Sequence, residues 1–340
     1  MGNARLSAIV SRLKVNPGRR LTERHVLEAA IPYTSGERTY VIGVDTKILD
    51  QIKMIEEWRG YTRALEEFGR IASDIVHENA FLEALASVRI EGATVDAKRA
   101  RELIDTGEDP QTKSEREFVN YYRLLQEMDA FAGEPGRKKV TLRESDLRQF
   151  HAQIVADTFA DPSQAGQYRS GPVRVEMQEC DGTSTVLHTP PEALELPELM
   201  RQFLDWLDRA NNRPKDKLSG LLASALAHYE FVRIHPFVDG NGRCARFLAS
   251  LVLLQHGYDF RQLFCITEFY DRNRRKYSEA LHSVDQATVC YGVEPGEDGN
   301  HRVIERMVFD ATAWVRYFLG GLSQQMFLCR ERMSEGLKSP

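Results

Sequence analysis

The chain contains little cysteine and no closely paired cysteines. Among its 340 residues only five cysteines occur, none in a C-x-x-C pair: Cys180, Cys244, Cys265, Cys290 and Cys329. An odd and scattered set argues against a disulfide framework and against a cysteine-based zinc site, because both need closely placed pairs. This use of cysteine predicts a reducing compartment, and we expect the cytoplasm.

Long apolar runs are also absent from the sequence. No stretch reaches the roughly 20 residues that a membrane-spanning helix needs. The start, MGNARLSAIVSRLK, lacks the apolar core of a signal peptide. Leu6 stands where an N-myristoylation signal requires Ser or Thr. We therefore expect no membrane anchor.

The sequence has no excess of positive charge. Lys and Arg number 45 against 50 Asp and Glu, a formal net charge of −5. This balance argues against a general affinity for nucleic acid or acidic membranes. The hydrophobic and charged fractions, 42% and 28%, are ordinary for a globular protein. We find no internal repeat and no low-complexity segment.

Helical periodicity dominates most of the chain. Apolar residues recur at helical spacing and predict helices over 47–70, 71–90, 113–130, 142–156, 195–210, 217–232, 243–256, 273–286 and 303–325. Strand signals are few: the short run YVIGV at 40–44, and an alternating stretch at 173–189 around Asp181-Gly182, which predicts a hairpin. The sequence therefore predicts a mainly α protein with one small β-hairpin, preceded by an arm, 1–45, of unclear structure.

The stretch HPFVDGNGR, 235–243, lies between two apolar helical segments. The start of a helix presents unpaired N–H groups and the positive end of the helix dipole, so it attracts anions. Gly240 and Gly242 allow the backbone to approach a ligand closely. This arrangement predicts a phosphate-binding loop.

The side chains of this stretch indicate the same chemistry. Asp239 is suited to hold Mg²⁺ against phosphate oxygens, and Arg243 and Arg246 lie on one face of the following helix. His235 is a candidate general base because imidazole titrates near neutral pH. Nucleotidyl or phosphoryl transfer is the predicted reaction class.

Three other sites fit this stretch poorly. An EF-hand beginning at Asp239 would place Arg243 and Ser250 where oxygen ligands are needed. The chain contains no Walker A sequence. His228 and His235 lie seven residues apart, but there is no H-E-x-x-H sequence and no evident third zinc ligand.

The compound pattern H-P-F-x-D-G-N-G-R-x-x-R, 235–246, strongly resembles the signature of the Fic (filamentation induced by cAMP) domain. The resemblance implies a Fic-type helical core, ATP with Mg²⁺ as donor, and transfer of AMP to a Ser, Thr or Tyr hydroxyl of a target protein, which can be the protein itself. On this basis we expect an N-terminal helical region at 46–112, the Fic domain at 113–290 and a C-terminal helical segment at 291–340.

The resemblance also implies a role for each motif position. His235 would take the proton of the target hydroxyl and Asp239 would hold Mg²⁺. The nucleotide would be bound by Gly240, Asn241, Gly242, Arg243 and Arg246, the last reaching the γ-phosphate. Tyr277, in the landmark stretch 273–281, is a candidate adenine contact, although an isolated aromatic on a helix is more often part of a core.

The hairpin at 173–189 resembles the flap that precedes the motif in this family. There the flap aligns the backbone of the target by strand addition, which implies docking contacts from Val173, Val175 and Val186. The stretch GQYR, 166–169, is a further family landmark.

An upstream segment resembles an inhibitory motif of the family. Ser87 and Glu91 are four residues apart, hence on one face of a helix, and Gly92 suits a helix end. The stretch SVRIEG, 87–92, matches [ST]-x-x-x-E-[GN], which precedes the domain in class II Fic proteins. By resemblance, Glu91 would pair with Arg246 and exclude the γ-phosphate, because one guanidinium cannot serve two anions as a bidentate partner.

Alternatives remain open at this point. In the family the same loop also supports removal of AMP, with the inhibitory glutamate as base, and transfer of other phosphate-containing groups. A nucleotide-sensing DNA-binding regulator is a further reading, since the end of the chain is locally basic, although an amphipathic helix explains this better. The basic residues concerned are Arg302, Arg306, Arg316, Arg330 and Arg332. A homo-oligomer stays open as well, because some members of the family self-associate, and the sequence does not name the target protein.

Overall fold

A computed structural model of the chain describes residues 25–34, 36–67, 73–133, 139–178, 184–212, 219–259, 264–295 and 301–336. Its helices are α1 (Thr46–Glu67), α2 (Ser73–Ile90), α3 (Ala97–Thr106), α4 (Lys113–Gln126), α5 (Met128–Ala132), α6 (Glu144–Ile154), α7 (Leu196–Asn212), α8 (Gly220–Ile234), α9 (Asn241–Gln255), α10 (Thr267–Arg272), α11 (Arg274–His282) and α12 (Thr312–Gly336). The strands are β1 (His25–Tyr33), β2 (Gly36–Val44), β3 (Val175–Gln178), β4 (Ser184–His188), β5 (Ala287–Pro295) and β6 (His301–Asp310). The predicted mainly α fold with a small hairpin is confirmed.

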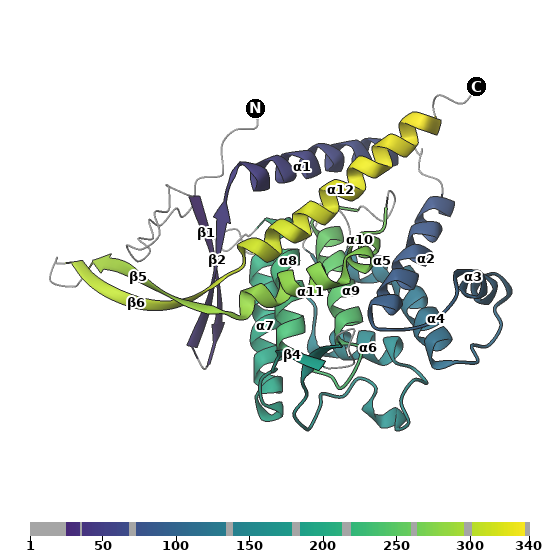
Figure 1. Cartoon of the computed structure of the whole chain (residues 1–340), viewed down its shortest axis with the longest axis horizontal. Helices are drawn as coiled ribbons and strands as arrows, with labels where there is room; N and C mark the ends of the chain where they lie inside the picture. The colour runs from purple at the N-terminus through teal and green to yellow at the C-terminus, as the bar shows by residue number, and fades with distance from the viewer. Residues whose placement is uncertain are drawn as a thin grey trace.

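Helices α8 and α9 form the centre of the molecule, surrounded by the other helices (Figure 1). Both are buried on nearly every side, which explains why their sequences are apolar all round. Helix α12 crosses α8 and is fixed there by Trp314, whose indole N–H donates to the carbonyl of Ala225 (2.7 Å). The paired helices α8 and α9 therefore form a rigid base for the loop that joins them.

Local signals explain where several surrounding helices begin and end. Thr112 and Glu115 form a capping box at the start of α4. Asp96 accepts hydrogen bonds from the first turn of α3, and Gly107 ends that helix in the left-handed conformation. These boundaries place α4, and with it Lys113 and Glu117, beside the α8–α9 loop.

A four-stranded sheet, which the sequence did not predict, lies beside the helices in the order β1-β2-β6-β5 (Figure 1). The run YVIGV belongs to β2, as predicted, but it pairs with β1 from the arm and with β6. The expected helix over 303–325 is wrong for its first part, because residues 301–310 form β6 and α12 begins only at Thr312. The expected C-terminal helical segment, 291–340, is corrected in the same way, and the helix expected to Gln286 ends at His282.

The reason lies in how this segment pairs. The apolar residues of 303–309 fit either helical or strand spacing. As β6 they pair antiparallel with the neighbouring β5, and the end of β6 also pairs with β2 from the opposite end of the chain. In the strand, Val308 is buried while Met307 is exposed. Asp310 then accepts a hydrogen bond from the backbone N–H of Thr312 and starts α12.

The predicted flap hairpin is confirmed as β3 and β4, which pair antiparallel with an irregularity between Val175 and Glu176. Its Asp181-Gly182 turn lies outside the described residues. Val173 and Val175 are half-buried, whereas Val186 is exposed. Among the described helices, none has both the length and the apolar character needed to cross a bilayer.

Gly166 provides a test of the packing beneath the loop. Its φ is +75°, and a Cβ there would lie 2.9 Å from the carbonyl oxygen of Arg148. We expect Gly166→Ala to lower the free energy of unfolding by about 2 kcal/mol, measured by chemical denaturation. Gly171→Ala is the matched control, because its Cβ would meet nothing within 4 Å, and its stability should not fall. Equal stability of the two variants would contradict this account.

Candidate active site

The α8–α9 loop reverses the chain at the centre of the fold. Helix α8 ends at Ile234, and the next residue, His235, adopts the left-handed conformation with φ 51° and ψ 60°. Helix α9 begins after Gly240, whose φ is 80°. A non-glycine residue in this region is strained, so the surrounding contacts must hold His235 in place.

Side-chain hydrogen bonds supply that support. Asn241 accepts from the backbone N–H of Phe237 (2.9 Å) and donates to its carbonyl (2.8 Å), which closes the loop on itself. The guanidinium of Arg169 donates to the carbonyl of His235 (2.8 Å) and to that of Pro191 (2.5 Å), beyond the flap. The predicted landmark 166–169 thus connects the loop to the segment after the flap.

His151, on α6, is a supporting residue that sequence reasoning missed. Its ring stacks on Phe237, with centroids 3.7 Å apart, and its Nε2–H donates to the carbonyl of Asp239 (3.0 Å). Its Nδ1 accepts from the N–H of Gly166 (2.9 Å), so the ring is the neutral Nε2–H form. Burial lowers the pKa of His151 to about 4, which keeps it in that form. A single histidine in an amphipathic helix gave no signal of this role.

The imidazole of His235 is poised to accept a proton. Its Nδ1 lies 3.2 Å from the carbonyl of Val232, which can only accept, so Nδ1 carries the hydrogen and Nε2 keeps its lone pair. Burial lowers the pKa of His235 to about 4. The ring is therefore neutral at pH 7, the state required of a general base.

Asp239 and Arg243 form a charged cluster with two residues of α4. Arg243 is fully buried, with its Nη1 3.2 Å from Glu117 and its Nη2 3.3 Å from Asp239. Lys113 lies 3.3 Å from the other oxygen of Asp239. Burial opposes ionisation of Asp239, but Arg243, the N–H of Gly240 and Lys113 outweigh it and lower its pKa.

This cluster fits a metal-bound polyphosphate. Asp239 is ionised and its side chain is 36% exposed, so one carboxylate can share Mg²⁺ with phosphate oxygens. Nε of Arg243 is buried and has no hydrogen-bond partner among the described residues, whereas Nη1 pairs with Glu117. A guanidinium beside a helix start suits an anion.

Arg246 is bound by the end of α2. Its Nη2 lies 2.7 Å from a carboxylate oxygen of Glu91 and donates to the carbonyl of Ser87 (3.0 Å), while its Nε donates to the hydroxyl of Ser87 (2.8 Å). Burial alone would lower the pKa of Arg246, but the charge of Glu91 outweighs burial and raises it. The structure thus brings the two predicted partners together.

Two glycines permit this contact. A Cβ on Gly242 would collide with the carboxylate of Glu91, so only glycine admits that carboxylate to the start of α9. Gly92, with φ +90°, turns the chain away directly after Glu91. The ion pair therefore depends on backbone shape on both sides.

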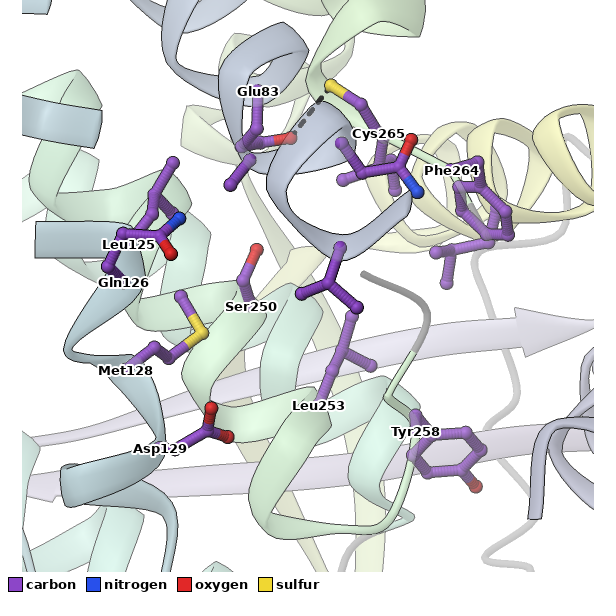
Figure 2. Close-up of a pocket in the computed structure, with 15 residues that line it drawn as sticks. Glu83, Leu125, Gln126, Met128, Asp129, Ser250, Leu253, Tyr258, Phe264 and Cys265 are labelled. Carbon is purple, nitrogen blue, oxygen red and sulfur yellow. Dashed lines mark hydrogen bonds between the residues drawn. The ribbon is translucent and has the colours of Figure 1, made fainter. Parts of the chain in front are cut away.

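Helix α2 is also held in place by Glu83, one turn before Ser87. The carboxylate of Glu83 accepts from the thiol of Cys265 (3.0 Å) and from the backbone N–H of Thr267 (3.3 Å) at the start of α10. Figure 2 shows the contact between Glu83 and Cys265, both of which line a cavity between α2, α5 and α9. The cavity has a volume of about 80 Å³. Residues 83, 87 and 91 follow at intervals of four, so one face of α2 carries all three anchors.

Tyr277 lies in an aromatic cluster rather than at the rim of the loop. It is buried, its hydroxyl lies 2.7 Å from Nε2 of His228, and its ring stacks on Tyr270 with centroids 4.7 Å apart. These contacts are those of a core residue, and its role toward adenine stays a prediction.

Fold and loop together define a helical protein whose central loop carries a neutral histidine, beside an arginine paired with Glu91. Comparison with known families gives a match of residues 141–253 to the Fic/DOC family. The chain therefore carries a Fic domain within these residues.

Curated relatives agree with the family match. The chain is 30% identical over 215 residues to the protein adenylyltransferase Fic of Drosophila virilis, covering 62% of this chain and 40% of that protein. With the protein of the same name from Drosophila willistoni it shares 28% over 211 residues, covering 61% and 39%. The chain thus spans about two fifths of the length of these curated relatives.

Solved structures share the fold. A Fic family protein from Desulfovibrio desulfuricans has a TM-score of 0.65 at 24% identity, covering 91% of this chain and 78% of its own. A Fic domain-containing signaling protein from Bacteroides thetaiotaomicron has a TM-score of 0.58 at 22% identity, covering 84% and 95%.

Asn241 tests how the loop is held. Asn241→Ala removes two hydrogen bonds and leaves the buried N–H and carbonyl of Phe237 unsatisfied, so we expect the free energy of unfolding to fall by about 2 to 4 kcal/mol. Chemical denaturation measures it. The control is Asn273→Ala, which loses one 3.3 Å hydrogen bond at a half-buried site and should cost less than about 1 kcal/mol. If Asn241→Ala lowers the free energy of unfolding less than Asn273→Ala does, the two hydrogen bonds of Asn241 do not hold the loop.

Proposed function

We propose that the protein is an adenylyltransferase that transfers AMP from ATP to a Ser, Thr or Tyr hydroxyl of a target protein. The main support for this proposal comes from the loop. It places a neutral His235, whose Nε2 is free, a few residues from the start of α9, which suits an anion. The names of the curated relatives support this activity.

In the proposed reaction the target oxygen attacks the α-phosphorus of ATP, a new P–O bond forms, and the bond to pyrophosphate breaks. His235 accepts the hydroxyl proton at Nε2, while its Nδ1–H stays on the carbonyl of Val232. Arg243 and the N–H groups at the start of α9 would hold the phosphates. Mg²⁺, when bound at Asp239, would neutralise phosphate charge.

The ion pair between Glu91 and Arg246 supports a built-in brake of the class II type. The carboxylate of Glu91 pairs with the guanidinium of Arg246, which would otherwise bind the γ-phosphate of ATP. Two anions at this one site would also repel each other. Because Ser87 and Glu83 anchor the same helix face, Glu91 is presented by a fixed element. A low basal rate of transfer is the expected consequence.

The flap is the proposed docking edge for the target. Val186 is exposed, as a residue awaiting a partner strand would be, and Arg169 couples the segment after the flap to the loop. The cytoplasm and a protein partner remain our expectations for the setting of this reaction.

A second function is supported by the same carboxylate. Glu91 lies at the start of α9 and its side chain is 29% exposed, so it could activate water for removal of AMP from a modified protein. The DNA-binding alternative gains no support from Arg316, which pairs with Asp45 (2.6 Å). The side chains of Arg302, Arg306, Arg330 and Arg332 are outside the described residues.

His235 is the test of the activity. In a Glu91→Gly background, which makes the rate measurable, His235→Ala should lower incorporation of labelled AMP at least about 100-fold, the usual contribution of a general base. Binding of ATP, followed by calorimetry, should change little. If transfer persists at the parental rate, His235 is not the base. If the Glu91→Gly protein does not transfer AMP, but the wild type, which keeps Glu91, releases AMP from a modified protein, the hydrolytic function is the correct one.

Glu91 is the test of the brake. Glu91→Gln and Glu91→Gly should raise AMP incorporation on the order of 10-fold or more, since a charge-assisted hydrogen bond contributes about 1.5 to 3 kcal/mol. The rate is measured on total protein and on the chain itself. Glu78→Gln, at an exposed carboxylate on the same helix that pairs with Arg101, is the control and should leave the rate unchanged. A brake is excluded if all three variants match the wild type.

A further inference from the structure

Three potential metal ligands meet at the base of the flap, away from Asp239. His188 ends β4, His282 ends α11, and Asp285 lies in the 3-10 turn Ser283–Asp285. Nδ1 of His188 and Nδ1 of His282 lie 3.3 and 3.0 Å from the same oxygen, Oδ2 of Asp285. One ligand atom from each residue lies within 4.8 Å of the others.

The hydrogen bonds of His188 leave its Nδ1 in an unusual position. Its Nε2 lies 2.8 Å from the carbonyl of Arg233, which only accepts, so Nε2 must carry a hydrogen. In the neutral ring, Nδ1 then points a lone pair at the carboxylate of Asp285. Two facing lone pairs repel, and either a proton or a metal cation between them removes the repulsion.

The groups behind these residues are those found behind metal ligands. A metal-bound histidine usually donates its other N–H to a carbonyl or carboxylate, as His188 does to Arg233. Oδ1 of Asp285 accepts from the hydroxyl of Tyr229 (2.5 Å), which in turn accepts from Arg38 (3.0 Å). Ring orientation and carboxylate orientation are thus fixed before any ion binds.

We propose that His188, His282 and Asp285 bind a divalent transition-metal ion, for which Zn²⁺ is the best match. Two imidazoles and a carboxylate are a common zinc set, and Zn–N and Zn–O distances of about 2.0 to 2.2 Å give tetrahedron edges of about 3.3 Å. The two nitrogen–oxygen separations, 3.3 and 3.0 Å, match such edges. Their side chains are 12%, 14% and 20% exposed, which leaves the fourth position to water.

The ion would connect β4 to two consecutive elements that lie far from it in the sequence. It joins the end of the flap to the end of α11 and to the turn that leads into β5, at the edge of the four-stranded sheet. Through Nε2 of His188 the same ring contacts Arg233, two residues before His235. The metal therefore fixes the flap relative to the loop, and it is a positioning site separate from the phosphate-binding loop.

Direct metal binding tests the site without any assay of AMP transfer. The full chain, stripped with a chelator and dialysed, is titrated with Zn²⁺ by calorimetry, and we expect one ion per chain. His188→Ala and His282→Ala should each weaken binding at least about 100-fold, and Tyr229→Phe about 10-fold, as loss of an outer-shell partner does. His77→Ala, at an exposed histidine of α2, is the control and should bind as the wild type does.

The visible absorption spectrum of Co²⁺ bound to the wild-type protein is a second test, and it does not require any variant to fold. Weak visible bands without a thiolate charge-transfer band identify a nitrogen and oxygen site and exclude binding by cysteine. Absence of stoichiometric binding to the wild type would overturn the proposal and leave a proton between His188 and Asp285. Binding that survives both histidine substitutions would overturn it as well.

Discussion

The reversal of the chain between α8 and α9 is the constraint on which the rest of the site depends. Two buried helices must be joined by a few residues without leaving backbone polar groups unpaired. Asn241, His151 and Arg169 satisfy those groups from three directions. The loop is therefore rigid before any ligand arrives, which is the condition for binding phosphate with little loss of conformational entropy.

Helix α2 is the second rigid part, and its spacing matters more than its composition. Glu83, Ser87 and Glu91 repeat every four residues and contact α10 and α9 in turn. Glu83 and Ser87 are buried and Glu91 is partly exposed, and the helix cannot slide by one residue without losing all three contacts. The carboxylate that pairs with Arg246 is consequently held in register by contacts one and two turns earlier on α2.

How much could be read from the sequence depended on whether a feature was local. The loop, its flanking helices and the pairing of Glu91 with Arg246 were predictable because short motifs carry them. The strand β6 was not, because its apolar residues fit two periodicities and one of its two partner strands, β2, lies at the other end of the chain. His151 and Lys113 were missed for a related reason, since single polar residues on amphipathic helices carry no mark of what they face after folding.

Gly242 links the loop to the brake in a way that concerns how such proteins can diverge. Its missing side chain is the space that the carboxylate of Glu91 occupies. Any larger residue at 242 would displace that carboxylate without altering α2, and it would also crowd Arg246 in the loop proposed to bind phosphate. Conversely, a chain that keeps glycine here retains room to acquire such a restraint from any helix end that reaches it. The absence of a side chain at residue 242 thus decides whether a carboxylate from another helix can reach Arg246.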